Sequence, residues 1–169
     1  MLMKTLIIVR HAKSSWANPG QEDIERPLNE RGKTDAPDMA GRLFKKKIQI
    51  DTFISSPAKR ARRTAAFFIE AYDGKEKDLV IDERLYPGSV SMFYEVVGDI
   101  KKRHSAAAIF SHNPGITDFV NTLTEHKIDN MPTCSVFIVT ADVEKWADFG
   151  EAKKQLLLFD YPKNGKHTG

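Results

Sequence analysis

"IIVRHAKSSW", residues 7–16, sets an apolar run directly against two polar, basic side chains. Residues 5–9 (TLIIV) are typical of a buried β-strand, because aliphatic and β-branched side chains follow one another almost without interruption. Arg10 and His11 come next, and the chain then turns polar. A strand that ends in a guanidinium and an imidazole is either a charged surface position or the beginning of an anion-binding site.

The rest of the chain alternates strand-like and helix-like segments. Apolar residues recur with helical spacing from Lys33 to Lys47 and again over 58–72, whereas residues 12–32 lack periodicity and are expected to form a long loop. The other expected elements are strands at 51–55, 79–83, 106–111, 135–140 and 155–161, and helices at 91–102 and after 114. This alternation predicts a three-layer α/β/α sandwich with a mostly parallel central sheet, in a single domain over residues 1–169.

Local signals add detail to this outline. Ser56–Pro57 and Asn113–Pro114 each read as a helix N-cap followed by proline at the first helical position. The strands at 135–140 and 155–161 are expected to pair across a loop that contains Trp146.

Three of the predicted strands are followed by segments that contain histidine or basic residues. RHAK follows the strand at 5–9, SSPAKR follows the strand at 51–55, and SHNPG follows the strand at 106–111. In open α/β sheets, ligands bind outside the carboxyl ends of the strands. We therefore expect two histidines and a group of basic side chains to meet at one edge of the sheet.

Composition excludes several classes of protein. The 26 basic and 23 acidic residues give a net charge of +3, too small to indicate nucleic-acid binding. Cys134 is the one cysteine, so no internal disulfide forms, and its position before an apolar strand indicates a packing role. The apolar run before Arg10 is too short for a signal peptide or a membrane span. A soluble cytoplasmic protein is expected, with a polar C-terminal stretch (161–169) that frays.

His11 is the candidate nucleophile. A neutral imidazole attacks phosphorus well and forms covalent intermediates. Nearby positive charge, such as that of Arg10, lowers the pKa of an imidazole and keeps it neutral. The same guanidinium binds phosphate through forked hydrogen bonds. Taken alone, an Arg-His pair at a strand end is more often a surface feature.

His112 and Arg60 are the candidate partners of His11. As an imidazolium, His112 can hold phosphoryl oxygens during transfer, although a histidine at a strand end can also be a cap or a core residue. Arg60 lies in the first turn of the helix expected after Ser56, near the strand end. The neighbouring Lys59, Arg62 and Arg63 are expected on a solvated helix face.

Other uses of these residues find less support in the sequence. His104 and His126 have no partner motif, and no Cys-rich or His-x-x-x-His pattern is present, so a metal site is not expected. A phosphate-binding loop of the Walker type is also absent, which excludes a P-loop kinase.

Together these segments carry a family resemblance. IIVRHAKSSW, RPLNERG, SSPAKRARRTA and SHNPG, spread over residues 7–118, resemble the histidine phosphatase superfamily, also called the phosphoglycerate-mutase-like fold. They look most like its small SixA-like branch of phosphohistidine phosphatases. The resemblance implies that His11 becomes phosphorylated, that Arg10, Arg60 and His112 form the phosphate pocket, and that no metal or organic cofactor is needed.

The chain departs from the family pattern beside the nucleophile. Members usually carry glycine after the catalytic histidine and asparagine six residues beyond it, but Ala12 and Ala17 occupy these places, and Asn18 follows one step late. Asn18 and Arg26 are candidates for substrate contacts at the mouth of the site. Arg26 can instead pair with Glu22, Glu25 or Glu30. The chain also lacks the large insertions with which mutases enclose a substrate, which argues against a mutase.

The general acid is the least determined role. Ester leaving groups need a proton, and Glu83 in IDERLYPGS is the candidate donor, although it can equally be a turn or salt-bridge carboxylate. A phosphohistidine leaves as an imidazole that can already carry a proton. A site weak in acids would therefore favour phosphoramidates over esters.

The function expected is a metal-independent phosphatase with a phosphohistidine intermediate. Its expected substrate is phosphohistidine on a protein. The alternatives are a phosphatase for a small phosphorylated substrate, such as a sugar phosphate or nucleotide, and a non-catalytic phosphate-binding adaptor. Neither a nucleic acid nor a membrane is an expected partner, and the oligomeric state is left open.

Overall fold

A computed structural model describes residues 3–164, in which six strands form one sheet in the order β3-β2-β4-β1-β5-β6. The strands are β1 (Met3–Arg10), β2 (Thr52–Ser55), β3 (Leu79–Ile81), β4 (Ala106–Ser111), β5 (Val136–Asp142) and β6 (Lys154–Asp160). The helices are α1 (Glu30–Lys45), α2 (Lys59–Ala71), α3 (Val90–Gly98) and α4 (Gly115–Val120). Short 3₁₀ turns include η1 (Asp23–Glu25) and η3 (Glu83–Leu85).

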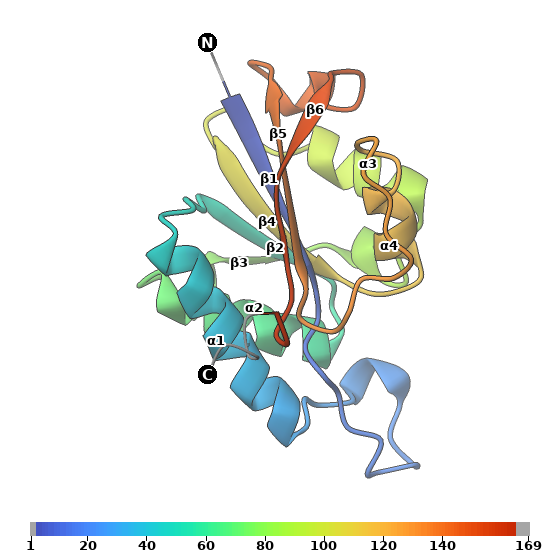
Figure 1. Ribbon diagram of the computed structural model, residues 1–169. Coiled ribbons are helices and arrows are strands. Elements are labelled where there is room, and N and C mark those ends of the chain that lie inside the picture. The colour runs from blue at the N-terminus through green and yellow to red at the C-terminus, as the bar shows by residue number, and fades with distance from the viewer. Residues whose placement is uncertain (1–2, 165–169) are drawn as a thin grey trace.

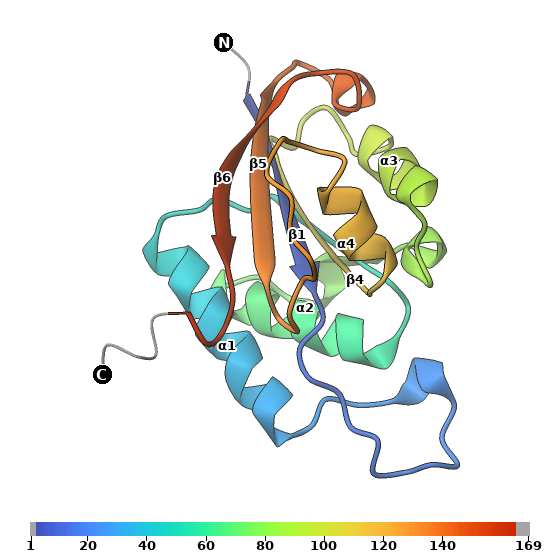
Figure 2. The same ribbon diagram turned by 45° about the vertical axis from the view of Figure 1, so that its right-hand side comes forward.

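Helices cover both faces of this sheet, so the predicted three-layer arrangement is confirmed (Figures 1 and 2). Side chains of β1 alternate between the two faces: Leu6 and Ile8 lie in the core under α3 and α4, and Ile7 and Val9 lie in the core under α1 and α2. All six residues of β4 are buried, as expected for a central strand covered on both faces.

Parallel pairing brings three strand ends together. β4 pairs in parallel with β1 and with β2, so that Arg10 lies opposite Ser111 and Ser55 lies opposite Phe110. The segments after β1, β2 and β4 therefore leave the sheet side by side, as predicted. β5 and β6 are antiparallel, which agrees with a sheet that is mostly but not wholly parallel.

The long loop expected over residues 12–32 is shorter in the structure. α1 begins at Glu30 rather than near Lys33, because Asn29 caps the helix by accepting a hydrogen bond from the Gly32 backbone N–H at 2.9 Å. Gly32 lies so close to the chain after His11 that an added Cβ would stand 2.2 Å from the Lys13 carbonyl oxygen. This glycine serves close packing rather than a turn.

Both predicted cap-plus-proline starts are wrong. The N-cap of α2 is Ala58, and the N-cap of α4 is Pro114. The Ser56 hydroxyl accepts from the Ala58 N–H at 3.1 Å but also bonds a histidine, and the Asn113 side chain bonds Asn130 and Thr117. These polar side chains organise the loops at the sheet edge instead of beginning helices. The helix expected at 91–102 also ends early, at Gly98.

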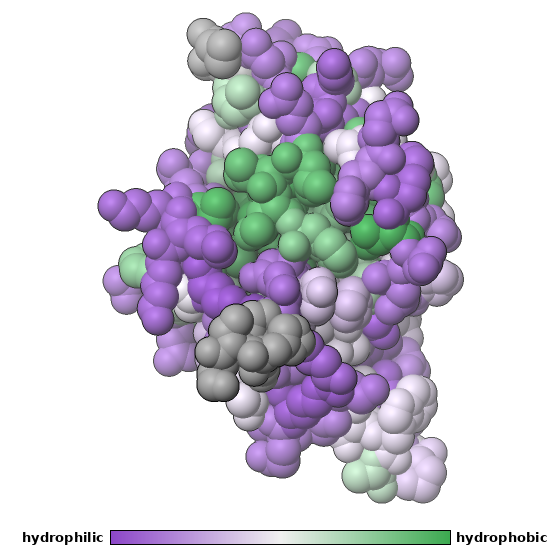
Figure 3. All heavy atoms as spheres, viewed as in Figure 1, coloured by the Kyte–Doolittle hydropathy of each residue, from purple (hydrophilic) through white to green (hydrophobic). Residues whose placement is uncertain are grey.

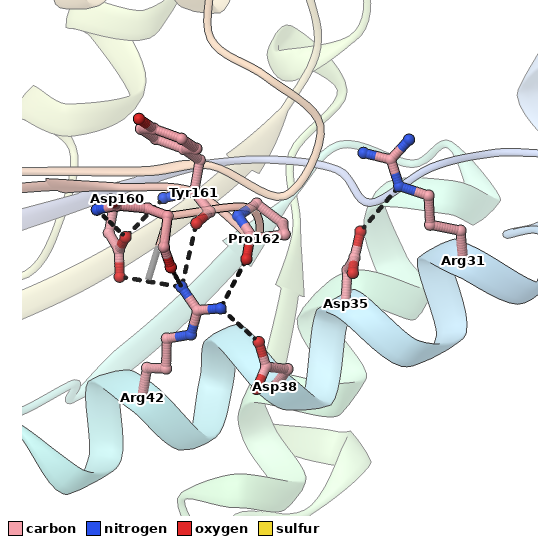
Figure 4. Close-up of polar contacts among 8 residues, drawn as sticks. Arg31, Asp35, Asp38, Arg42, Asp160, Tyr161 and Pro162 are labelled. Carbon is pink, nitrogen blue, oxygen red and sulfur yellow. Dashed lines mark hydrogen bonds and ion pairs between the residues drawn. The ribbon is translucent and has the colours of Figure 1, made fainter. Parts of the chain in front are cut away.

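Arg42 of α1 anchors the last described residues (Figure 4). Its Nη2 donates to Asp38 at 2.8 Å and to the Pro162 carbonyl at 2.7 Å, and its Nη1 donates to the Tyr161 carbonyl at 3.1 Å. Residues 161–164 are thus held on α1, contrary to the prediction that this stretch frays. Residues 165–169, to which the same prediction applied, lie outside the described residues.

The second half of the sheet ends in a hairpin at its edge. β5 and β6 pair across a loop that contains Trp146, as predicted, and Cys134 before β5 is buried.

Apolar side chains gather on the face shown in Figure 3, where β6 lies in Figure 1, and Leu157 of β6 is 54% exposed. A bulge near Leu157 interrupts the ladder, and such bulges discourage edge-to-edge association. Within residues 3–164, no helix has the length and apolar character needed to cross a membrane.

Candidate active site

His11 stands at the carboxyl end of β1 in a rigid backbone. Its N–H donates to the Ser111 carbonyl of the neighbouring strand at 3.1 Å, and its own carbonyl accepts from the Cys134 N–H at 3.0 Å. The next residue is tied to α2, because the Ala12 N–H donates to Thr64 Oγ1 at 2.9 Å. Three elements therefore fix the position from which the imidazole projects.

The hydrogen bond at Nδ1 determines the tautomer of His11. Nδ1 lies 2.7 Å from the Ala12 carbonyl oxygen, which can only accept, so the proton resides on Nδ1 and Nε2 carries a free lone pair. Burial lowers the pKa of His11 well below its usual range, and the charges of Arg60 and Arg10 lower it further. The ring is therefore neutral at physiological pH, with an unprotonated nitrogen.

His112 follows β4 and lies beside His11, with ring centroids 5.1 Å apart. Its Nε2 lies 2.6 Å from the Ser56 hydroxyl, which already accepts from the Ala58 N–H, so the hydroxyl proton is best directed at Nε2. This leaves the proton of His112 on Nδ1, which is buried and has no partner among the described residues.

The charge of His112 depends on its surroundings. Burial and the nearby charge of Arg60 lower the pKa of His112 to about 3. Without a bound anion, His112 is therefore a neutral N–H donor at physiological pH, and the imidazolium expected during phosphoryl transfer stays a prediction.

Two arginines flank the histidines. Arg10 ends β1 and donates from Nη1 to the Met131 carbonyl at 2.8 Å, and Arg60 lies in the first turn of α2, as predicted. The Nε atoms of both guanidinium groups are buried without a partner among the described residues. Such buried donors are rare in proteins and point to an acceptor that residues 3–164 do not supply.

Asp23 of η1 is the carboxylate of the site. Its Oδ2 accepts from Arg60 Nη2 at 2.9 Å and from the Tyr86 hydroxyl at 2.6 Å. Its backbone carbonyl accepts from Arg60 Nη1 at 2.7 Å. The hydrogen bonds from Tyr86 and Arg60 lower the pKa of Asp23 to about 2, so this carboxylate is ionised throughout the physiological range.

Arg26 closes the mouth of the site. It is buried, its Nη2 donates to the Ser14 hydroxyl at 3.0 Å, and its Nε lies 3.2 Å from Asp23 Oδ1. Its guanidinium carbon stands 3.5 Å from the centre of the Trp16 ring, a close cation–π contact. Arg26 thus pairs with Asp23 rather than with Glu22, Glu25 or Glu30, and its Nη1 is a further buried donor without a partner in the described chain.

These side chains surround one small cavity. Its volume is about 230 Å³. The lining residues are Arg10, His11, Lys13, Ser14, Trp16, Asp23, Arg26, Arg60, His112, Asn113 and Thr133. This volume is below the roughly 300–1,000 Å³ of pockets that enclose whole small molecules. The cavity suits a compact anion with the rest of its molecule outside.

The structure gathers five of the seven predicted site residues, namely Arg10, His11, Arg26, Arg60 and His112. Glu83 and Asn18 do not line the cavity. Both are exposed, Glu83 in η3 and Asn18 in the loop before η1. Within residues 3–164, no group of three or more histidine, cysteine or carboxylate side chains is placed to hold a metal ion.

Sequence reasoning missed several members of the site. Asp23 stands three residues before Arg26 in a segment read as plain loop, and Ser56 was read as a helix cap. The i, i+3 spacing of Asp23 and Arg26 was the available signal for the first. Trp16, Ser14 and Thr133 gave no comparable signal, because only the fold brings their loops to the cavity.

Part of the sequence matches a known protein family and a protein of known name. Residues 6–86 match the model of the histidine phosphatase superfamily (branch 1). Phosphoserine phosphatase 1 of Hydrogenobacter thermophilus is 34% identical over 85 residues, which is 49% of this chain and 38% of that protein. The match thus covers well under half of that relative.

Solved structures match over nearly the whole chain. A SixA structure from Agrobacterium tumefaciens has a TM-score of 0.79 at 22% identity and covers 94% of this chain and 98% of its own. The protein histidine phosphatase SixA complexed with tungstate has a TM-score of 0.79 at 21% identity and covers 95% and 98%. At this level of identity the likeness establishes the fold, which is the phosphoglycerate-mutase-like fold expected from the motifs.

Proposed function

We propose that this chain, a member of the histidine phosphatase superfamily, is a phosphatase that removes phosphoryl groups from phosphohistidine on a protein. His11 is the nucleophile, and Arg10, Arg60 and His112 hold the phosphoryl oxygens. The observation that carries this proposal is the lone pair on His11 Nε2, set among buried donors that have no partner in the described chain.

The reaction proceeds by two in-line displacements. In the first, a bond forms between His11 Nε2 and phosphorus while the bond to the leaving group breaks, and its electron pair departs with that group. In the second, water attacks phosphorus, the electron pair of the P–N bond returns to His11, and both protons of the water remain with the product, which leaves as dihydrogen phosphate. The Ala12 carbonyl holds the proton on Nδ1 through both steps.

Charge stabilisation comes from the donors around the cavity. Arg10 Nε, Arg60 Nε and His112 Nδ1 are buried and unpartnered in the described chain, and Arg26 Nη1 adds a fourth at the mouth. Donors held in place before the reaction stabilise developing charge without reorganisation. These four donors are available to the three oxygens of a phosphoryl group.

Two features support a protein phosphohistidine as substrate. The cavity of about 230 Å³ admits a phosphoryl group and leaves its carrier outside, which suits a side chain on a protein surface. The carboxylate that lines the cavity, Asp23, is ionised and donates no proton to an ester oxygen. A phosphoramidate needs no such donor when its leaving nitrogen belongs to an already protonated ring.

The second candidate is a phosphatase for a small phosphoester. The match of 34% identity to phosphoserine phosphatase 1 favours it, because that protein's name specifies an ester substrate. An ester requires an acid, and Glu83 is the residue predicted from the sequence for that role. Turnover of both substrate classes by the natural chain separates the candidates, and a loss of ester hydrolysis alone in Glu83→Gln would show that this carboxyl reaches the leaving group although it does not line the cavity.

A trapping experiment tests the proposal directly. A protein carrying ³²P-phosphohistidine is mixed with the chain, and phosphate release and acid-labile label on the chain are measured over time. Rapid release with transient label on His11 is expected. Binding of phosphate without any label on His11 would identify a non-catalytic adaptor, and hydrolysis of phosphoesters alone would select the second candidate.

A further inference from the structure

An ionised carboxylate is an unexpected part of a phosphate-binding cavity. We propose that Asp23 accepts a hydrogen bond from the protonated imidazole ring of phosphohistidine and so makes the site selective for this leaving group over an alkoxide. The proposal rests on the proposed function, because it assigns the specificity of the same site.

The position of Asp23 is fixed from three directions. Oδ2 accepts from Arg60 Nη2 and from the Tyr86 hydroxyl, which satisfies its two lone pairs. Oδ1 has a single close neighbour in the described chain, Arg26 Nε at 3.2 Å. The side chain is 49% exposed, so Oδ1 offers an accessible lone pair at the mouth of the cavity.

The sign of the charge argues for a cationic leaving group. Asp23 stands 2.9 Å from Arg60 Nη2 and lines the same cavity as His11 and His112. A fixed negative charge there repels the phosphoryl oxygens of either substrate, and the uncharged carrier of a simple phosphate ester does nothing to offset that repulsion. The same charge attracts a substrate whose phosphoryl group is joined to an imidazolium, because the positive ring then lies next to the carboxylate.

The chemistry balances without a general acid. The ring of the substrate carries phosphorus on one nitrogen and a proton on the other, and the carboxylate of Asp23 accepts a hydrogen bond from that N–H. When His11 Nε2 bonds to phosphorus, the P–N bond of the substrate breaks, and its electron pair remains on the ring nitrogen. The ring leaves as a neutral imidazole that still carries its proton, and Asp23 stays ionised throughout.

A purely positioning role makes a different prediction. Asp23 also holds Arg60 and Arg26, and the loss of that support would weaken phosphoryl binding for every substrate. A role toward the leaving group affects phosphohistidine and not a phosphoester of the same phosphoryl group. The ratio of the two activities therefore distinguishes the roles.

The test compares Asp23→Asn with Glu25→Gln, which removes a charge from the same short turn but lies outside the cavity. Hydrolysis of a phosphohistidine peptide and of 4-nitrophenyl phosphate is measured for each from pH 5.5 to 8.5. We expect Asp23→Asn to lower kcat/KM for the peptide about tenfold relative to the ester. The alkaline limb of kcat for the peptide should move down by about one pH unit, since an adjacent anion stabilises the imidazolium.

Each outcome separates the inference from the proposed function. Equal losses on both substrates with an unmoved alkaline limb would overturn the role toward the leaving group and leave the phosphatase proposal intact. A natural chain that hydrolyses the ester but not the peptide would overturn the proposed function, and this inference with it. Asp23→Ser, smaller and also uncharged, repeats the test if Asp23→Asn fails to fold by circular dichroism.

Discussion

Arg42 and Arg60 both lie on helices and both hold aspartates, yet their guanidinium groups are satisfied differently. Nη1 and Nη2 of Arg42 donate to two carboxylates and to the carbonyls of residues 161, 162 and 164, all from its own chain (Figure 4). Arg60 donates both terminal nitrogens to Asp23 and keeps a buried Nε without a partner among the described residues. Arg42 has no buried side-chain nitrogen without a partner among the described residues, whereas Arg60 retains one, and such a donor is suited to a ligand.

A difference in burial and position separates two of the histidines. His104 precedes β4, lies outside the cavity and is partly exposed. His11 is buried in the cavity with one nitrogen fixed by a carbonyl and the other free. His11 thus combines burial with a free ring nitrogen, which is the property that the proposed mechanism requires.

The largest expected effect comes from His11. His11→Ala removes the nitrogen that bonds to phosphorus in the proposed mechanism, and we expect kcat to fall about 10³-fold or more, as for loss of other enzymatic nucleophiles. Acid-labile label on the chain should disappear with it. His104→Ala is the matched control and should retain both. Residual acid-labile label in His11→Ala would place the nucleophile elsewhere.

Matched lysine substitutions at the two arginines test the comparison itself. Arg60→Lys keeps the charge but loses the Nε donor and the forked geometry, so kcat/KM should fall about 10²-fold. Arg42→Lys should keep full activity and lower Tm by about 3–10 °C, because several hydrogen bonds to the end of the chain are lost. Activity assays and thermal melts of both variants check the pair. A loss of activity in Arg42→Lys would erase the distinction between them.

Ser56→Ala tests the hydrogen bond between the Ser56 hydroxyl and His112 Nε2. Without the hydroxyl at 2.6 Å, nothing in the described chain fixes the proton of His112 on Nδ1, and kcat should fall about tenfold, the equivalent of one hydrogen bond. KM should change less, because the arginines remain. Ser55→Ala is the control, since Ser55 Oγ donates to the Ser56 carbonyl and lies outside the cavity. Equal effects of the two substitutions would show that the hydroxyl acts only through packing.

The parts of the molecule that the sequence predicted are those governed by strand and helix periodicity. The runs at 5–9, 51–55 and 106–111 had to be buried strands, and parallel strands share one carboxyl edge, so His11, Arg60 and His112 converge as expected. The residue predicted as the general acid does not line the cavity. Glu83 follows a short strand but is exposed, and the carboxylate in the cavity is Asp23 from another loop.

Loop geometry explains most of the remaining differences. Ser56 and Asn113 have the chemistry of helix caps, but tertiary partners at the sheet edge use their polar atoms instead. The short segment that carries Asp23 and Arg26 is held by contacts to α2 and to Tyr86, which lie far away in the sequence. Local propensity contains no information on such contacts. Hydrophobic periodicity therefore predicted where the site lies, but not all of the residues that form it.

The last expected effect concerns the dependence of stability on pH. The folded pKa of His112 lies at about 3, and that of His11 is also depressed, whereas both titrate near 6.5 in an unfolded chain. Below pH 6.5 the unfolded chain binds protons that the folded chain does not. The stabilising contribution is therefore complete above pH 6.5 and declines toward pH 3, by at most about 1.4 kcal/mol per pH unit for each histidine.

His112→Asn tests this account in thermal melts between pH 4 and 8. The variant removes one of the two groups, so Tm should depend less steeply on pH below 6.5 than in the natural chain, whatever its value at pH 8. His104→Asn is the control, because burial lowers the pKa of His104 to a lesser degree and outside the cavity. An unchanged slope in His112→Asn would mean that the folded and unfolded chains protonate His112 at the same pH. Burial would then not keep His112 neutral below pH 6.5, and the cavity would hold an imidazolium beside its arginines at mildly acidic pH.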